Sequence, residues 1–369
     1  MKPLIFAELI YKICSHSSLV PEKPLYWTII ANPKAGGFTI PFRWKKHYSQ
    51  LIDCVDKAEV NPKHSNAAPS KTALDQGNDQ GLILTRERGH AGSIVQALIE
   101  EVLTKTSSEN QPFFLIITAG GDGTSLEVLT ALYNMPLELR SRIAVLRLPM
   151  GTGNDGADAF ELDKTLDLII SPSKLTYQRA IKLITSTKGK GPFLAFNILS
   201  IGLDAFVTHM TNKTKGKLPG DFYKLWVDIA ALLYEKLYKI DTMEVRALDD
   251  SLKEVVNFKE KLLLLAVGAS GNRSYGSQKR ILPDERNVCA IKQTPLFRKI
   301  VLKKLLNTGN HVNHSESILF NAKSLEIQSK HPILAQMDGE TVLLNTEDFP
   351  LTIELSEPVI PILIPNTSP

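Results

Sequence analysis

A glycine-rich segment that carries one carboxylate is the strongest chemical signal in the chain. It reads Gly120-Gly121-Asp122-Gly123-Thr124 and lies between an apolar run, 113–118, and a helical pattern, 125–134. Glycines allow positive φ angles and let the backbone approach a ligand, and the start of a helix presents unpaired N–H groups to an anion. The segment therefore predicts a cradle for a di- or triphosphate, although a plain tight turn would use the same residues.

Three further polar or glycine-rich segments also follow apolar runs. Residues 149–155 (PMGTGND) offer backbone N–H groups and a hydroxyl, residues 32–37 (NPKAGG) end the first run, and residues 85–91 end another. Loops of this kind meet at the carboxyl edge of an open parallel sheet, where ligands bind. Four such loops favour a nucleotide site over a set of unrelated turns. The P-loop pattern GxxxxGK[ST] is absent.

The elements that would position these loops alternate between strand and helix patterns. Up to about residue 185, helical spacings separate short apolar runs at 25–31, 82–85, 113–118 and 143–148. Buried strands that alternate with helices indicate an α/β domain with a doubly wound, mostly parallel sheet. Beyond Pro192 the pattern is mostly polar turns and strands, such as those at 317–320 and 324–328, and one helical pattern at 222–238 interrupts it. We therefore expect a separate β domain.

Composition excludes several classes of protein. The 369 residues are 43% hydrophobic and 22% charged, which is typical of a globular protein of two domains and excludes a disordered, coiled-coil or collagen-like chain. No apolar run approaches 18 residues, and Glu8 and Lys12 interrupt the only segment that resembles a signal peptide. Three widely spaced cysteines predict neither a zinc site nor a disulfide framework. We therefore expect a cytoplasmic protein.

Positive charge is concentrated in one window of the chain. Residues 270–304 carry nine basic and two acidic side chains, a net charge of +7 within a chain of net charge +4. An ordinary solvated face would explain this pattern, and so would attraction to a nucleotide or an anionic membrane surface. Nucleic acid is not an expected partner, because no recognised binding motif accompanies the charge.

In their order along the chain, the motifs resemble the diacylglycerol kinase/sphingosine kinase catalytic-domain family. Besides GGDGT, NPKAGG and GTGND, three later segments match the family pattern: FNILSIGLDA at 196–205, Asn272 with Tyr275-Gly276 and Pro283, and QMDGE at 336–340. The resemblance covers roughly residues 25–365. GGDGT alone is shared with NAD kinases and phosphofructokinase-like enzymes, whereas the ordered set is not.

The resemblance implies a two-domain lipid kinase that uses ATP and Mg²⁺. An α/β nucleotide-binding domain would comprise residues 24–187 with 345–369, and a β-sandwich-like lipid-binding domain would comprise residues 188–344, with residues 1–23 as an amino-terminal extension. Lipid would bind between the two domains. The expected reaction transfers the γ-phosphate to the hydroxyl of a membrane lipid, with diacylglycerol slightly ahead of sphingoid bases.

The resemblance also implies roles for individual residues. Asp338 would be the general base on the acceptor hydroxyl, and Glu340 would crowd a second carboxylate beside it. Asp122, Asp155 and Asp204 would place Mg²⁺. Asp204 could instead cap a helix or turn, and Asp338 with Gly339 could form an ordinary hairpin turn. The expected nucleotide contacts are Asn32, Thr85, Gly120, Gly121, Asp122, Gly123, Thr124, Ser125, Leu126, Gly151, Thr152, Gly153 and Asn154.

Two segments depart from the family pattern. Gly156-Ala157-Asp158 follows GTGND where the family commonly has an aromatic residue, alanine and arginine. Residues 284–288 lack the Asp-Gly pair that helps to hold a structural Mg²⁺ in bacterial members, so that second metal site is not expected here unless Asp284 substitutes.

Two other classes of function are kept as alternatives. One is a kinase of a soluble substrate such as NAD, and the other is a nucleotide- or lipid-binding protein without catalysis. The expected location is the cytoplasm, with reversible association with anionic membranes, and a homodimer is left open.

Overall fold

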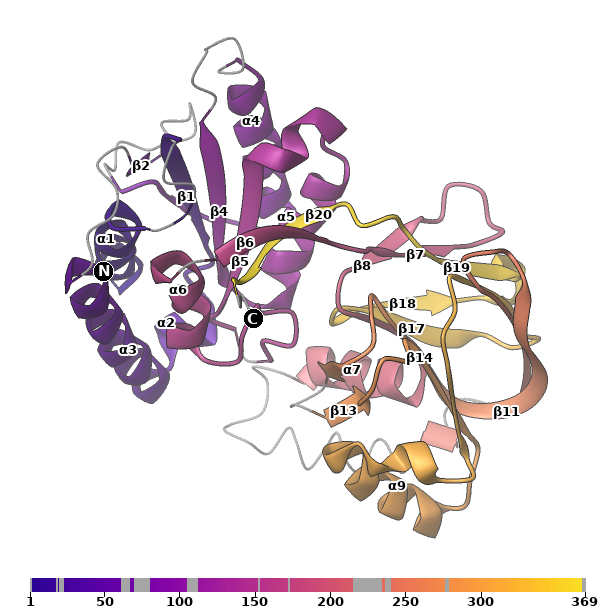
Figure 1. The fold of residues 1–369 in the computed structure, drawn as a ribbon. Helices are drawn as coiled ribbons and strands as arrows, with labels where there is room; N and C mark the ends of the chain where they lie inside the picture. The colour runs from indigo at the N-terminus through magenta and orange to yellow at the C-terminus, as the bar shows by residue number, and fades with distance from the viewer. Residues whose placement is uncertain are drawn as a thin grey trace. The chain divides into compact units, whose positions relative to one another are not determined.

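The computed structural model describes residues 2–17, 19, 23–60, 67–69, 80–104, 112–151, 153–171, 173–214, 234–235, 240–275 and 279–366. The chain divides into two compact units, which comprise Met1–Gln178 with Pro358–Pro369 and Arg179–Glu357. Figure 1 shows a sheet with helices along it in the first unit, and in the second unit antiparallel strands with helices α7 and α9.

The first unit has the expected mostly parallel sheet. Its described strands follow the order β2-β1-β4-β5-β20-β6, and β3 also pairs with β1. All of these pairings are parallel except that of β20 with β6. Every residue of β4 and β5 is buried, as the continuous apolar runs of a parallel sheet predict. The strands are β1 Leu25–Ala31, β2 Ala67–Pro69, β3 Leu82–Leu84, β4 Phe113–Gly120, β5 Ile143–Pro149, β6 Ser173–Gln178 and β20 Ile360–Pro365.

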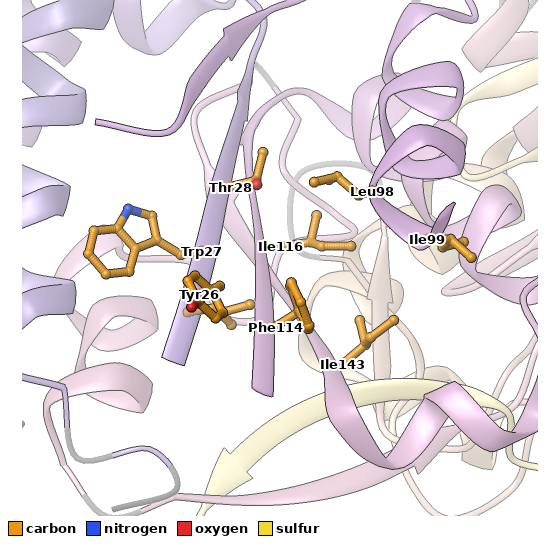
Figure 2. A pocket seen from close by; sticks show the side chains of 9 residues that line it. Tyr26, Trp27, Thr28, Leu98, Ile99, Phe114, Ile116 and Ile143 are labelled. Carbon is orange, nitrogen blue, oxygen red and sulfur yellow. The ribbon is translucent and has the colours of Figure 1, made fainter. Parts of the chain in front are cut away.

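Helices pack on both faces of this sheet. Figure 2 shows Trp27 on the opposite side of β1 from Leu98 and Ile99 of α4. Trp27 shares an apolar core with residues of α1, α3 and α6, such as Leu51 and Leu166. The sheet is therefore doubly wound. The helices are α1 Lys2–Ser15, α2 Gly36–Thr39, α3 Pro41–Val60, α4 His90–Thr104, α5 Asp122–Tyr133 and α6 Leu162–Ile170, with a 3₁₀ turn η2 at Leu137–Arg142.

Helix α1 belongs to the first unit, which corrects the expectation of an extension over residues 1–23. Phe6, Leu9, Ile10 and Ile13 are buried in the same core as Trp27. These four positions repeat at helical spacing and form one face of the helix, so the segment has an apolar stripe that must be covered. Helix α3 covers most of this stripe, and α6 and the strands β1 and β2 cover the rest.

The second unit is a separate antiparallel sheet domain. Its described strands follow the order β18-β17-β9-β11-β10-β16-β19-β7-β8, with β14 paired to β11 and β15, and with a separate β12-β13 hairpin. Strand β11 pairs with β10 through its first half and with β9 and β14 through its second half. Side chains from both halves of the sheet, such as Val245, Ile327 and Leu265, share one apolar core, as in a β-sandwich.

The elements of this unit have the following bounds. The strands are β7 Ile181–Ile184, β8 Phe193–Ala195, β9 Ile198–Gly202, β10 Thr242–Leu248, β11 Glu254–Gly268, β12 Arg273–Tyr275, β13 Lys279–Leu282, β14 Val288–Lys292, β15 Ser317–Phe320, β16 Ser324–Gln328, β17 Ile333–Met337, β18 Glu340–Leu344 and β19 Leu351–Leu355. The helices are α7 Leu203–Thr214 and α9 Leu296–Thr308, and the 3₁₀ turns are η3 Asn310–Asn313 and η4 Thr346–Asp348.

The division between the units differs from the expected boundaries after residues 187 and 344. Strands β7 and β19 pair with each other in the second sheet, so residues 179–187 and 345–357 belong to the second unit. Among the described strands that follow β7, β20 alone returns to the first sheet. Residues Arg179 and Ala180 alone separate β6 from β7, and a strand pattern does not reveal which sheet a strand joins. The helical pattern expected over residues 222–238 lies outside the described residues except for Tyr234 and Glu235.

Candidate functional site

The GGDGT segment joins β4 to α5, as expected. Gly120 ends β4, Gly121 is the N-cap of α5, and no side chain caps this helix start. Gly121 has an extended backbone with φ −98°, so this turn does not need a positive φ. Space is what the loop requires, because a Cβ atom at Gly120 would lie 2.5 Å from the Thr124 hydroxyl oxygen. The uncapped first turn of α5 can offer its N–H groups to an anion.

The loop after β5 lies directly against the GGDGT loop. A Cβ atom at Gly151 would lie 2.5 Å from the Cα atom of Gly121 and 2.9 Å from Oδ1 of Asn154. The backbone N–H of Gly151 donates to that same Oδ1 over 2.6 Å, and Asn154 has a left-handed backbone with φ 63°. The structure therefore brings Gly151 and Asn154 to the predicted phosphate loop. Thr152 lies outside the described residues.

The segment that follows β1 and the helix α3 also hold the Gly151 loop. The Gly37 N–H donates to the Met150 carbonyl over 2.8 Å, and Arg43 donates from Nη1 to the Gly151 carbonyl over 2.9 Å. Sequence reasoning missed Arg43, which carries no motif around it. Asn32 follows β1 and accepts the Lys34 N–H on its side-chain oxygen.

Helix α5 also holds the loop that follows β3. The Thr85 N–H donates to the Ala31 carbonyl, which continues the pairing of β3 with β1. Glu127 accepts the N–H groups of Gly89 and Ala91, at 2.7 and 3.1 Å, and so satisfies donors at the start of α4. The sequence did not reveal Glu127. In this way the carboxyl ends of β1, β3, β4 and β5 form one edge, as the four loop motifs predicted.

Other predicted nucleotide residues serve the packing of the loop through their side chains. Thr124 and Ser125 are buried, and the Ser125 hydroxyl lies 3.3 Å from that of Thr118. Leu126 is half-buried and Gly123 lies in the first turn of α5. If these residues contact a nucleotide, Thr124 and Ser125 would do so chiefly through their backbones.

Two of the three predicted metal-site carboxylates meet in the first unit. A Cβ atom at Gly153 would lie 2.8 Å from Oδ2 of Asp122 and 3.7 Å from Oδ2 of Asp155. Oδ1 of Asp122 accepts the N–H of Gly156 over 3.0 Å. Carboxylate oxygens are the ligands that Mg²⁺ prefers. Within the described residues, no three His, Cys, Asp or Glu side chains are grouped as a metal site, and Asp204 belongs to the second unit.

The first departure from the family pattern is explained by a buried ion pair. Asp158 accepts from Nε and Nη2 of Arg147, at 2.9 and 2.6 Å, and both side chains are 5% exposed. Its second oxygen accepts the backbone N–H of Arg147 over 2.6 Å. Arg147 lies in the middle of β5, so this pair fastens the end of the Gly151 loop to the sheet. An arginine at position 158 would place two like charges together here.

In the second departure, the carboxylate of Asp284 is already bonded to Arg286. Both oxygens of Asp284 accept from the Arg286 guanidinium, and this hydrogen bond lowers the pKa of Asp284. A metal ion at Asp284 would have to displace this positively charged guanidinium, so the structure does not favour a metal site there.

Asp338 and Gly339 form the two-residue turn between β17 and β18. Both have positive φ angles, 45° and 93°, as the turn of a two-residue hairpin requires. The Asp338 carboxylate also accepts the backbone N–H groups of Phe196, Asn197 and Ile198, at 2.5, 3.0 and 2.9 Å. The turn thus joins two motifs that lie far apart in the sequence. These N–H groups occupy lone pairs that a general base would use, so a proton acceptor here must release at least one of them.

A buried chain of hydrogen bonds links this turn to Asp204. The Gly339 N–H donates to Gln336, the Gln336 side-chain amide donates to the Ser200 hydroxyl over 3.0 Å, and Ser200 donates to Asp204 over 2.7 Å. Burial raises the pKa of Asp204, whereas the Ser200 hydrogen bond and the positive charge of Lys279 act in the opposite direction. Asp204 lies in the first turn of α7. It therefore ends a polar network of the second unit.

Glu340 begins β18 and is half-buried next to this turn. Asn212 of α7 donates to the Gly339 carbonyl over 2.8 Å, so α7 packs on the hairpin. Sequence reasoning did not find Asn212, Ser200 or the role of Gln336, because each is defined by a contact between separate elements.

An apolar cavity of about 340 Å³ lies beside Asp204 in the second unit. Its wall is mostly apolar, with three lysines, of which Lys299 forms an ion pair with Glu235. Burial lowers the pKa of Lys299. The sequence had no pattern that revealed this cavity. The lining residues come from α7, β11, β12, β13, β14 and α9, and are Leu203, Asp204, Val207, Leu263, Leu264, Tyr275, Lys279, Ile281, Ile291, Lys299, Ile300, Leu302, Lys303 and Leu306.

Comparison with known proteins supports the resemblance seen in the motifs. The family model of the diacylglycerol kinase catalytic domain matches residues 26–185. The chain is similar to a probable lipid kinase YegS-like of Cronobacter sakazakii, with 25% identity over 77% of this chain and 86% of the relative. It is also similar to a probable lipid kinase YegS of Salmonella arizonae, with 25% identity over 80% of this chain and 91% of the relative.

Among solved structures, a candidate diacylglycerol kinase of Bacillus anthracis str. Sterne shares the fold. The two superpose with a TM-score of 0.56 and 20% identity, over 94% of this chain and 99% of the other. The recognition of the family from its motifs is thus confirmed, as are the two-part fold and the assignment to phosphotransferases with an alcohol acceptor.

Proposed function

We propose that the chain belongs to the family of diacylglycerol kinase-like lipid kinases, to which its motifs and relatives are similar. It would transfer the γ-phosphate of ATP to a hydroxyl of a membrane lipid, with diacylglycerol as the first candidate. The observation that carries the lipid part is the apolar cavity beside Asp204, since an acyl chain needs an apolar enclosure with few polar groups. Sphingoid bases and other lipids with a free hydroxyl are the next candidates.

The nucleotide would bind at the edge formed by the four loops of the first unit. The N–H groups at the start of α5, with Gly120 and Gly121 leaving room for close approach, suit the phosphates. Gly151, Gly153 and Asn154 border the same loop. Asn32, Thr85 and Thr152 complete the set of nucleotide contacts that we propose.

Asp122 and Asp155 would hold Mg²⁺ in this kinase. Their carboxylates converge on Gly153, and oxygen donors fit this cation. When bound, Mg²⁺ would neutralise charge on the phosphates during transfer. Asp204 is a weaker candidate, because its carboxylate already accepts the Ser200 hydroxyl.

Asp338 would accept the proton of the lipid hydroxyl, with Glu340 beside the turn at the start of β18. The Asp338 carboxylate is held in one orientation by the N–H groups of residues 196–198. Exchange of one of these hydrogen bonds for a bond from the substrate hydroxyl would place that hydroxyl for proton transfer to Asp338. The chain Gln336–Ser200–Asp204 would keep the turn rigid.

Reversible membrane association is part of the proposal. Among the described residues, no helix is both long and apolar enough to cross a bilayer. A kinase that acts on a bilayer lipid can reach it through surface docking. We therefore propose a protein that works at the cytoplasmic surface of an anionic membrane.

Transfer of labelled phosphate from ATP to lipid in mixed vesicles tests the function. We expect a labelled lipid with diacylglycerol in the vesicles, and a panel of sphingosine, phosphatidylglycerol and NAD defines the acceptor. Asp338→Asn should lower kcat by about 10² to 10⁴, because an amide does not take the proton, and should leave ATP affinity nearly unchanged. Asparagine tolerates a positive φ, but its NH₂ group would face N–H donors of residues 196–198, so thermal unfolding must show that the variant remains folded. Wild-type turnover of this variant would remove Asp338 from the mechanism, and the absence of any labelled lipid would refute the function.

A further inference from the structure

Helix α9 carries a cluster of exposed apolar side chains. Leu296, Phe297, Ile300 and Val301 are 51, 78, 49 and 37% exposed. Residues one turn apart on a helix are neighbours, so these four side chains form one continuous surface, which we call the α9 patch. Single exposed apolar residues are ordinary, whereas a contiguous group on one element is typical of an interaction site.

The helix that bears the α9 patch is firmly held at its end and along one side. Gly309 closes the helix with a left-handed backbone, φ 81°, and a Cβ atom there would lie 2.7 Å from Pro283. Leu302 is buried between the helix and the sheet. The α9 patch is therefore a fixed feature of the second unit, and the exposure of its side chains shows that they face away from the core. Figure 1 shows α9 at the margin of this unit.

The charges of α9 all have one sign. The helix has no acidic residue and carries Arg298, Lys299, Lys303 and Lys304, of which Lys303 and Lys304 are exposed. Cationic side chains next to apolar ones are the pattern of a helix that lies in the interface of an anionic membrane.

The electrostatic attraction of this region to an anionic membrane is weaker than the net charge of +7 of residues 270–304 suggested. At least four of the nine basic side chains have acidic partners: Arg286 bonds to Asp284, Lys292 to Glu260, Arg298 to Glu316 and Lys299 to Glu235. Three of these acidic partners lie outside the window in sequence, so the sequence did not reveal the neutralisation. A surface that binds membranes with this charge needs an apolar contribution, which the α9 patch can supply.

The other side of α9 forms a wall of the apolar cavity. Lys299, Leu302, Lys303 and Leu306 line the cavity, and Ile300 belongs both to this wall and to the α9 patch. The helix is thus the partition between the cavity and the surroundings of the second unit.

From these contacts we propose that α9 is a membrane-docking helix, which inserts the α9 patch between the lipids of an anionic bilayer and brings the cavity behind it to the membrane surface. The placement of the cavity at the membrane surface rests on the proposed function, whereas docking itself does not, because docking does not require phosphate transfer. A second copy of the chain is a poorer occupant, because four side chains of one helix bury far less than the roughly 1,000 Å² that a stable protein interface needs.

Vesicle flotation without nucleotide tests the docking. The variant Leu296→Ser/Phe297→Ser changes two residues of the α9 patch that do not line the cavity. Phe42→Ser is the matched control, since Phe42 of α3 is 72% exposed and lies in the first unit. With vesicles of phosphatidylcholine and about one-third phosphatidylglycerol, we expect the double variant to partition at least tenfold less than wild type, about 1.4 kcal/mol, and the control to match wild type.

A second readout separates docking from chemistry. Activity on a short-chain diacylglycerol that is dissolved as monomers should be equal in wild type and the double variant, because no membrane is involved. Equal vesicle binding by wild type and the double variant would overturn the proposal. So would a concentration-dependent dimer, seen without lipid, that the double variant abolishes, because the α9 patch would then join two copies. Vesicle binding lost as expected, with no transfer to any lipid by wild type, would refute the proposed function and leave docking intact.

Discussion

Replacing Gly151 by alanine should lower kcat/KM by roughly 10²-fold and weaken the binding of ATP, although it adds only one methyl group. The new Cβ atom would lie 2.5 Å from the Cα of Gly121 and 2.9 Å from Oδ1 of Asn154, where ordinary contacts of a Cβ atom begin near 3.4 Å. The neighbours at Gly121 are backbone atoms, so they cannot move aside like the end of a flexible side chain. One of the two loops must therefore shift by about 1 Å.

The size of the effect follows from that shift. A displacement of about 1 Å in a site that positions reacting groups costs roughly 10²-fold in rate, which corresponds to about 2.7 kcal/mol. Gly156→Ala is the matched control in the same loop, because a Cβ atom there would lie 3.6 Å from Asp122, an ordinary contact. We expect this control to stay within tenfold of wild type.

Isothermal titration with an ATP analogue and kcat/KM for the preferred lipid would measure both variants. Thermal unfolding of each variant checks that the first unit remains folded. Wild-type affinity and turnover in a folded Gly151→Ala variant would show that the close approach of the two loops has no part in nucleotide binding.

Two further predictions concern stability. Burial lowers the pKa of His311 from its usual 6.5, and this side chain is fully buried and bonded to the Ile281 carbonyl, so it takes up a proton less readily in the fold than when unfolded. The stability of the second unit should therefore be complete above pH 6.5 and fall as the pH drops below it. Urea unfolding between about pH 7 and 5 should show a smaller loss of stability in His311→Gln. Asp158→Asn leaves Arg147 as a buried charge without its partner, so denaturant unfolding should show a loss of about 3 to 5 kcal/mol, and Arg147→Met in the same chain should recover part of it; additive losses would argue against the pair.

The parts of the fold that the sequence predicted are those set by local pattern. Apolar runs such as 113–118 and 143–148 are buried strands because both of their faces are covered, and this makes them unmistakable in sequence. The glycine motifs after these runs lie at one sheet edge because the strands are parallel neighbours. Antiparallel strands such as 317–320 and 324–328 were likewise predicted with their observed bounds.

The features that sequence could not reveal depend on pairing between distant segments. Residues 296–304 appeared only as a basic window, since a helix with apolar residues on more than one side has no clean amphipathic pattern. The acid partners Glu235, Glu260 and Glu316 are brought to this window by the fold. Likewise, β6 and β7 have the same strand pattern but join different sheets.

The Asp338 turn shows why a motif and a mechanism are separate questions. A two-residue turn with positive φ angles accounts for Asp-Gly at these positions without any chemistry. That explanation does not account for the carboxylate, which reaches three consecutive N–H groups at residues 196–198, nor for Gln336, which is buried and bonded to both Gly339 and Ser200. A turn alone gains nothing from a buried polar chain that ends at Asp204 in the wall of an apolar cavity. Because buried polar groups are costly unless they are fully bonded, this network fits the proposal that the Asp338 carboxylate must be held in one orientation.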